Sequence, residues 1–229
     1  MKKNRQIQKK IQDYWIKTPD LFAEKYTSPL LAVFSPANAF LQSRRKKVLA
    51  LVGDLRDKKV LDAGCGSGIF MVDFIKRGAM VTGVDYSQKM LEMAKNLLNQ
   101  QKISSSRYWL VKAEATNLPF KKREFDIILA TGLADYLSQA QNELFLLQAS
   151  KVVKKNGLLI CGFPVKESPV GFLRYGFGLW LREHLFKLPP IESYFSLSEI
   201  RAMLKKADLK ETKHLKVFST MWIIVAKHV

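Results

Sequence analysis

The chain has 229 residues, of which 48% are hydrophobic, and a formal net charge of +18. This length suits one domain, and the apolar content is enough for a complete core, which excludes a wholly disordered chain. Two cysteines are too few for a disulfide framework, and no stretch approaches about 18 uninterrupted apolar residues, so we expect a cytoplasmic protein without membrane-spanning helices.

The positive charge is concentrated near the N-terminus. Residues 1–60 hold 14 of the 38 Lys and Arg residues but only 5 of the 20 Asp and Glu residues. Such a field attracts nucleic acid, anionic lipid or an acidic ligand. A merely solvated basic surface explains the same composition, so the charge alone leaves the partner open.

The first 57 residues have a helical and basic character. A helix is expected within residues 35–55, where Ser35 is a suitable N-cap and Pro36 suits the first helical turn. We interpret residues 1–57 as one N-terminal segment that forms a lid or a substrate cap for the domain at 58–229.

From Lys58 onward, short apolar runs alternate with longer helical patterns. The apolar runs lie at 58–64, 79–85, 107–115, 125–131 and 157–163, and the helical patterns at 68–77, 87–101 and 137–153. Apolar strands separated by helices are typical of a parallel sheet that is covered on both faces. The last two runs, 209–218 and 220–227, are joined by too short a turn for a parallel crossover. We therefore predict an α/β, Rossmann-like, doubly wound sheet of seven strands, mostly parallel with a reversed C-terminal strand.

One segment, residues 163–190, does not fit the alternation and is expected to be an insertion after the fifth strand. It is rich in aromatic residues interleaved with basic ones. Such a composition suits a hydrophobic or amphipathic ligand, presented in solution or at a membrane surface. A helix packed on the domain's own sheet is an equally simple interpretation.

The stretch VLDAGCGSGIF places three glycines, Gly64, Gly66 and Gly68, directly after the first predicted strand. Glycines allow a tight turn and a close approach of the backbone to a ligand at a helix N-terminus. A dinucleotide fingerprint would need glycine at position 69, where this chain has Ile69. Asp62 adds a negative charge, which is unfavourable beside a pyrophosphate and favourable beside an ammonium or sulfonium group.

The next strands also end in residues that can bind a nucleoside. Asp85 ends the second strand, 23 residues after Asp62, where a carboxylate can accept hydrogen bonds from both ribose hydroxyls. Glu114 follows the third strand, and Thr131 and Gly132 follow the fourth. Because the carboxyl ends of parallel strands meet at one edge, these residues predict a site for a cation that carries adenosine.

Together, these motifs resemble those of the class I S-adenosylmethionine-dependent methyltransferases, in particular the small bacterial members. VLDAGCGSG resembles the first motif of that family, VTGVDYSQKMLEMA the second, and AEATNLPF with FDIILATGLADYL the later ones. The resemblance covers about residues 58–163. It implies S-adenosyl-L-methionine as the methyl donor and S-adenosyl-L-homocysteine (SAH) as the product.

The resemblance also implies a set of cofactor-binding residues that follow the ends of the first four strands. They are Asp62, Gly64, Cys65, Gly66, Gly68, Asp85, Tyr86, Met90, Ala113, Glu114, Ala115, Thr131 and Gly132. In the family pattern the glycines line the methionine portion, Asp62 and the carbonyl of Thr131 meet its amino group, and Asp85 holds the ribose.

Tyr86 and Met90 would flank the adenine, and Ala113 with Glu114 would meet its edge. Aspartate is commoner than glutamate at the position of Glu114 in that family. Met90 is equally compatible with a purely structural role in the core of a helix.

The sequence does not identify a catalytic base. Asp135, Tyr136 and His184 are weak candidates for a polar role, and Asp135 is equally compatible with a helix N-cap. Relatives often close a tyrosine from an N-terminal helix over the cofactor, for which Tyr14 and Tyr26 are candidates. Direct in-line methyl transfer does not always require a base, and no metal site is expected.

Two absences narrow the acceptor. The N/D-P-P-Y motif of enzymes that methylate exocyclic amines of nucleic acids is replaced by TGLA, and neither Cys65 nor Cys161 is placed as a nucleophile. We therefore favour a small or lipid-like acceptor, with peripheral contact to an anionic membrane as a further option. An RNA methyltransferase that uses the basic N-terminal region and a non-catalytic binding module stay open, whereas Ile69 and Asp62 disfavour a nicotinamide-dependent oxidoreductase.

Overall fold

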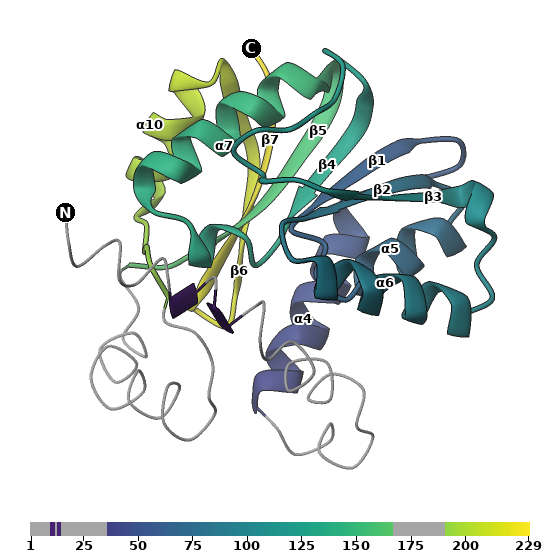
Figure 1. Cartoon of the computed structure of the whole chain (residues 1–229). Coiled ribbons are helices and arrows are strands. Elements are labelled where there is room, and N and C mark those ends of the chain that lie inside the picture. The colour runs from purple at the N-terminus through teal and green to yellow at the C-terminus, as the bar shows by residue number, and fades with distance from the viewer. Residues whose placement is uncertain (1–9, 12, 15–35, 167–190) are drawn as a thin grey trace.

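A computed structural model describes residues 10, 11, 13, 14, 36–166 and 191–229. Seven strands form one sheet in the order β3-β2-β1-β4-β5-β7-β6, and helices cover both of its faces (Figure 1). The predicted Rossmann-like α/β fold with a reversed C-terminal strand is confirmed.

The strands follow the predicted apolar runs closely. Their bounds are β1 Lys59–Ala63, β2 Met80–Asp85, β3 Tyr108–Lys112, β4 Phe125–Ala130, β5 Val153–Pro164, β6 Leu209–Val217 and β7 Met221–His228. The pairs that β1 forms with β2 and β4, and those of β2 with β3 and β4 with β5, are parallel. β7 pairs antiparallel with both β5 and β6, so β7 alone runs against the other strands.

The helices form two layers, one on each face of the sheet (Figure 1). The bounds are α4 Pro36–Leu51, α5 Ile69–Lys76 and α6 Gln88–Gln100 on one face, and α7 Gln139–Val152 and α10 Leu197–Lys206 on the other. Short 3-10 turns lie at η1 Ser105–Arg107 and η2 Ala134–Tyr136. Each face buries its own cluster of apolar side chains against the sheet.

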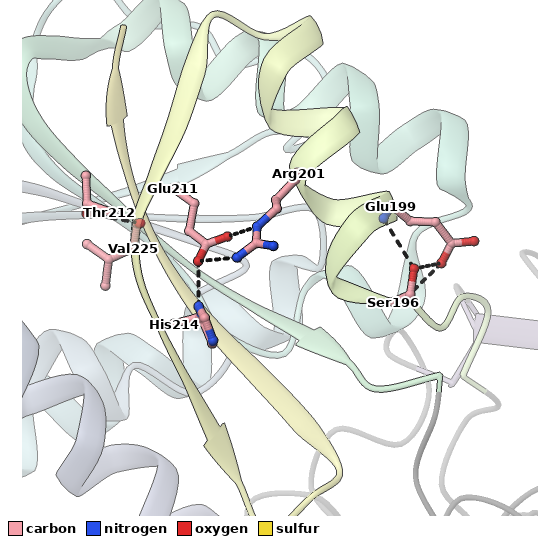
Figure 2. A network of polar contacts seen from close by, with 7 residues as sticks. All are labelled: Ser196, Glu199, Arg201, Glu211, Thr212, His214 and Val225. Carbon is pink, nitrogen blue, oxygen red and sulfur yellow. Dashed lines mark hydrogen bonds and ion pairs between the residues drawn. The ribbon is translucent and has the colours of Figure 1, made fainter.

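Local sequence signals explain where two of these helices begin. The Ser196 hydroxyl caps α10 by accepting from the backbone N–H of Glu199, whose carboxylate accepts from the backbone N–H of Ser196 (Figure 2). Ser138 and Gln141 form the same reciprocal box at the start of α7. Such boxes satisfy two backbone donors that would otherwise lack partners.

One boundary differs from the prediction, since β5 begins at Val153 rather than at residue 157. Helix α7 ends at Val152 and the backbone enters the strand directly. The N–H groups of Arg123 and Glu124 donate to the carbonyls of Lys151 and Val152, which draws this stretch to the sheet before the apolar run starts. Polar residues at the start of β5 hid this extension from the sequence pattern.

Several predicted features lie wholly or largely outside the described residues. The predicted insertion at 163–190 is described only as far as residue 166, and both Tyr26 and His184 fall outside as well. The helix expected within 35–55 is confirmed as α4.

The topology fixes where a ligand can bind. From β1 the chain proceeds outward through β2 to β3, and from the neighbouring β4 it proceeds through β5 in the opposite direction. The loops after β1 and β4 therefore diverge at the carboxyl ends of these strands, and open α/β sheets bind ligands in the crevice at such a point.

Candidate functional site

The glycine loop between β1 and α5 folds back onto β2. The N–H groups of Gly64 and Cys65 both donate to the carbonyl of Val84, at 2.8 and 2.9 Å, and the N–H of Gly68 donates to the carbonyl of Cys65 at 3.0 Å. Gly68 precedes α5, and no side chain caps this helix. The first N–H groups of α5 are thus left for a ligand, and a helix N-terminus favours an anionic group.

Two of the glycines are required by their surroundings as well as by their backbone angles. Gly64 has a φ of 72°, and a Cβ added there would lie 3.2 Å from the Cδ1 atom of Leu133 in the loop after β4. Gly68 has a φ of 82°, and an added Cβ would lie 3.0 Å from the Cβ atom of Ala94 in α6. Any side chain at these positions would push the loop away from its neighbours.

Asp85, at the end of β2, holds three segments together. Its Oδ2 atom accepts from the N–H of Gly66 at 3.0 Å and its Oδ1 atom from the N–H of Ser87 at 2.9 Å. Its carbonyl accepts from the N–H of Ala113 after β3 at 3.2 Å. Because each carboxylate oxygen can accept more than one hydrogen bond, Asp85 can brace the loop and still receive ligand hydroxyls.

Two acids, Asp62 and Asp85, are buried side by side beneath this loop, with 3% and 8% of their surfaces exposed. The pKa of Asp62 is raised to about 7, mainly by burial and also by the negative charge of Asp85, while Arg44 opposes the shift. Burial also raises the pKa of Asp85, against the N–H groups that donate to it. Two poorly compensated carboxylates favour a ligand that carries positive charge.

Arg44 is a site residue that the sequence did not single out. It comes from α4, and its guanidinium carbon lies 6.0 Å from the ring centre of Phe40 and 5.9 Å from that of Phe70 in α5. A Cβ added to Gly132 would lie 3.0 Å from its Nη1 atom. Its Nε atom is buried and has no hydrogen-bond partner among the described residues. This guanidinium can therefore receive an anionic group such as a carboxylate.

The only sequence signal for Arg44 was the basic run SRRKK, which does not say which residue faces the site. The neighbouring Arg45 points elsewhere and forms a two-point ion pair with Asp73 of α5, with an Nε–Oδ2 distance of 2.6 Å. Which of the two arginines faces the site depends on how α4 packs, and the spacing of residues in the sequence does not determine this packing.

A separate apolar cluster lies beside α6 on the predicted adenine side. Ile11 and Met90 are buried in it, and the partly buried side chains against them belong to Tyr14, Tyr86, Met93 and Tyr136. Met90 therefore packs outside the two main cores, with the predicted N-terminal tyrosine Tyr14. Burial raises the pKa of Tyr86, and its hydroxyl has no partner among the described residues.

The remaining predicted cofactor residues differ in how deeply they are buried. Ala115 is buried and Ala113 half-buried, whereas Glu114 is exposed and its carboxylate accepts a hydrogen bond from the hydroxyl of Thr116 at 3.3 Å. Cys65 is buried, which raises the pKa of its thiol well above the usual range, consistent with a small filling residue. The hydroxyl of Thr131 is buried without a partner among the described residues.

The loop after β4 forms the other wall of the crevice. The side-chain amide of Asn142 donates to the carbonyls of Ala134, Leu137 and Ser138, which fixes the turn η2. The interpretation of Asp135 as a helix cap is wrong, because Ser138 caps α7. The carbonyl of Asp135 instead accepts from the N–H of Glu192 at 2.7 Å, so the chain that returns at residue 191 packs against this turn.

Glu192 is a second residue that the sequence did not reveal. Its Oε2 atom is buried and has no hydrogen-bond partner among the described residues, and burial raises the pKa of this carboxyl group. No motif surrounds it in the sequence PPIESYF. Only the contact with Asp135 shows that it returns to the loop that follows β4.

Among the described residues, no group of three His, Cys, Asp or Glu side chains is arranged to hold a metal ion. None of the described helices combines the length and apolar character needed to cross a membrane.

Comparison with known proteins matches this site to a family. Residues 60–157 match the methyltransferase domain family. A ubiquinone biosynthesis O-methyltransferase of Pelagibacter ubique is 28% identical over 164 residues, which cover 69% of this chain and 64% of that protein. A demethylmenaquinone methyltransferase of Tropheryma whipplei is 29% identical over 194 residues, which cover 76% of each. This chain thus spans slightly less than two thirds of the first relative.

Solved structures share the fold at lower identity. The crystal structure of magnesium protoporphyrin IX methyltransferase from Synechocystis PCC 6803 with bound SAH is 18% identical, with a TM-score of 0.77. The superposition covers 97% of this chain and all of that one. At this identity the likeness supports the seven-stranded fold alone.

Proposed function

We propose that this chain, a class I S-adenosylmethionine-dependent methyltransferase, acts on an aromatic, lipid-like methyl acceptor. The acceptor is an isoprenoid quinol, or a related hydroxylated aromatic molecule with an apolar tail. The family follows from the matched methyltransferase domain, its named relatives and the strand order of the sheet. The methyl donor is S-adenosyl-L-methionine.

The residues of the crevice fit this donor. The glycine loop leaves a cradle that any Cβ at Gly64 or Gly68 would disturb, and the two buried acids suit a ligand with ammonium and sulfonium charges. We infer that Asp62 receives the ammonium group, Arg44 the carboxylate and Asp85 the ribose hydroxyls. The cluster around Met90 would then cover the adenine.

The extent of similarity to the named relatives carries the choice of acceptor. The two relatives named for quinones align over 69% and 76% of this chain, whereas the methyltransferase domain accounts for only residues 60–157. Their similarity therefore extends beyond residues 60–157, into the parts of the chain that we expect to select the acceptor. Methyl transfer from a sulfonium requires an electron-rich acceptor, and a quinol is such an acceptor.

Chemically, the bound donor supplies an activated methyl group, whose transfer breaks one S–C bond. Transfer to a hydroxyl forms an O–C bond and releases the hydroxyl proton, which needs an acceptor. We infer that the buried Oε2 atom of Glu192 takes this proton, because that atom has no hydrogen-bond partner in the described part of the chain and Glu192 is held against η2. A carboxyl group with a raised pKa is a stronger base than an exposed one.

The acceptor can be tested with purified protein, S-adenosyl-L-methionine and a panel of short-chain acceptors. The panel contains a hydroxylated ubiquinol precursor, a demethylated naphthoquinol, a tail-free catechol and a transfer RNA mixture, with methylation read by mass spectrometry. We expect methylation of a tailed quinol at least about tenfold faster than that of the tail-free ring, since the apolar tail adds binding energy. Methylation of RNA alone would overturn the proposal.

Glu192→Gln is expected to lower kcat at least about tenfold and to leave SAH affinity within about twofold, because general-base contributions are typically 10²–10⁴-fold. In the wild type, log(kcat/KM) should rise with pH through the raised pKa of Glu192 and then level off. The variant should lose this limb. Glu143→Gln, which removes a half-buried carboxylate paired with Lys206, is the control. An unchanged pH profile in Glu192→Gln would refute this role.

A further inference from the structure

The turn between β6 and β7 carries an exposed aromatic side chain. Phe218 and Ser219 are the central residues of the turn between β6 and β7, and this turn is closed by the N–H of Thr220, which donates to the carbonyl of Val217 at 3.1 Å. The φ angles of Phe218 and Ser219 are 50° and 52°, and the Phe218 side chain is 55% exposed. Such turns favour glycine or asparagine, so the fold itself does not explain a bulky residue here.

Lysines lie on the two elements that lead into Phe218 and hold the neighbouring Phe40, namely β6 and α4. Lys213 and Lys216 are exposed on β6, and the ammonium of Lys47 in α4 donates to the carbonyl of Lys216, which ties α4 to the strand. Phe40 of α4 lies beside Phe218, with ring centres 6.4 Å apart. We call these five residues, Phe40, Lys47, Lys213, Lys216 and Phe218, the tip surface.

Glu211 of β6 and Asp73 of α5 are each paired with an arginine. Glu211 faces Arg201 and His214, with an Nε–Oε2 distance of 2.7 Å to the arginine (Figure 2). Asp73 is paired with Arg45 of α4. Neither acid is paired with a lysine of the tip surface, while the ammonium of Lys216 lies 4.3 Å from the ring centre of Trp222 and that of Lys47 donates to a backbone carbonyl. These contacts leave the lysines positively charged, and the whole chain is strongly basic.

The tip surface lies at the same end of the strands as the candidate site. Met221, at the start of β7, pairs with Pro164 at the carboxyl end of β5. A Cβ added to Gly162 would lie 3.1 Å from the sulfur of Met221 and 3.5 Å from the Cα of Thr131, which follows β4. Figure 1 shows the start of α4 and the β6–β7 turn at this same end of the molecule.

We propose that the tip surface docks on an anionic membrane, with Phe218 inserted among the headgroups and its lysines against the lipid phosphates. Exposed aromatics flanked by cations bind membrane interfaces in this way. RNA is less favoured, because binding of single strands uses a groove with several stacking aromatics, whereas Phe218 protrudes from a sharp turn. The proposed quinol acceptor gives this docking a purpose, but the docking itself is measurable without methyl transfer.

The test is co-sedimentation of the full chain with vesicles of phosphatidylcholine, with or without phosphatidylglycerol. Phe218→Asn places a residue that tolerates positive φ in the turn, so the thermal melting temperature should be retained or raised while binding to anionic vesicles falls about fivefold or more. Lys213→Gln with Lys216→Gln should lower binding at least about tenfold, at roughly fivefold per lysine. Neutral vesicles should bind only weakly.

The matched controls lie elsewhere on the molecule. Trp109→Thr removes another exposed aromatic, from β3 at the opposite edge of the sheet, where 52% of the side chain is exposed. Lys122→Gln with Lys155→Gln removes two exposed charges near the amino ends of the strands. Both controls should keep vesicle binding within about twofold.

Equal losses in the controls and the tip variants would overturn the proposal in favour of diffuse charge attraction. Tip variants that bind vesicles normally but lose affinity for a single-stranded RNA would overturn it in favour of nucleic acid. If no quinol is methylated and yet vesicle binding depends on the tip as expected, the acceptor proposal fails and the docking surface stands.

Discussion

Asp85→Ala is expected to weaken SAH binding by at least about 100-fold. The carboxylate accepts from the N–H groups of Gly66 and Ser87, and we infer that it also accepts the ribose hydroxyls. Hydrogen bonds to a charged group contribute about 1.5–3 kcal/mol each, so the loss of two ribose bonds alone accounts for this factor. Removal of the carboxylate also leaves two backbone donors of the loop unpaired.

Isothermal titration calorimetry with SAH measures the effect, with thermal melting to show that each variant is folded. Asp85→Asn is the companion variant if the alanine protein is too unstable, because it keeps the size of the side chain. Asp126→Asn is the control, since Asp126 also accepts a backbone N–H, from Lys59, but near the amino ends of the strands. Unchanged affinity in both Asp85 variants would place the ribose elsewhere and remove the main support for the site.

The sequence predicted this half of the site because its signals are local. Three alternating glycines after an apolar strand, and an acid at the end of the next strand, fix both residue type and position without knowledge of packing. Each of these residues lies at the carboxyl ends of β1 and β2, where the motif placed it. Asp85 could be placed at the end of β2, but its bond to the Gly66 N–H was visible only in three dimensions.

Arg44 and Glu192 depend on tertiary contacts that no local pattern encodes. Arg44 and Arg45 are adjacent and chemically identical, and only the packing of α4 on α5 turns one toward Phe70 and the other toward Asp73. Glu192 reaches η2 through a backbone hydrogen bond across nearly sixty residues of sequence. The acceptor side of the site is therefore much less predictable than the cofactor side.

Asp62→Asn is expected to stabilise the protein without ligand at pH 8 while it weakens cofactor binding. The pKa of Asp62 is about 7 in the folded state, well above its ordinary value near 4, because burial penalises the charged form. The folded state therefore binds this proton more tightly than the unfolded state. Stability should fall as the pH rises from about 4 to about 7, by an upper bound on the order of 4 kcal/mol.

Asparagine does not ionise, so the variant should lose this pH dependence. We expect it to be about 1–3 kcal/mol more stable than the wild type at pH 8 and similar at pH 5, by chemical denaturation. A cationic ligand reverses the balance, since the ammonium group we assign to Asp62 stabilises the carboxylate. SAH affinity of the wild type should thus increase from pH 5 to pH 8, and that of the variant should stay lower and nearly constant.

The two measurements together separate a binding acid from a structural one. A structural aspartate would make its replacement destabilising at every pH, because its buried hydrogen-bond partners would be lost. If Asp62 instead binds a cation, its buried charge destabilises the protein without ligand, and a bound cationic ligand offsets this destabilisation. If Asp62→Asn destabilises the protein at pH 8 and leaves SAH affinity unchanged, the ammonium contact is wrong and Asp62 only supports β1.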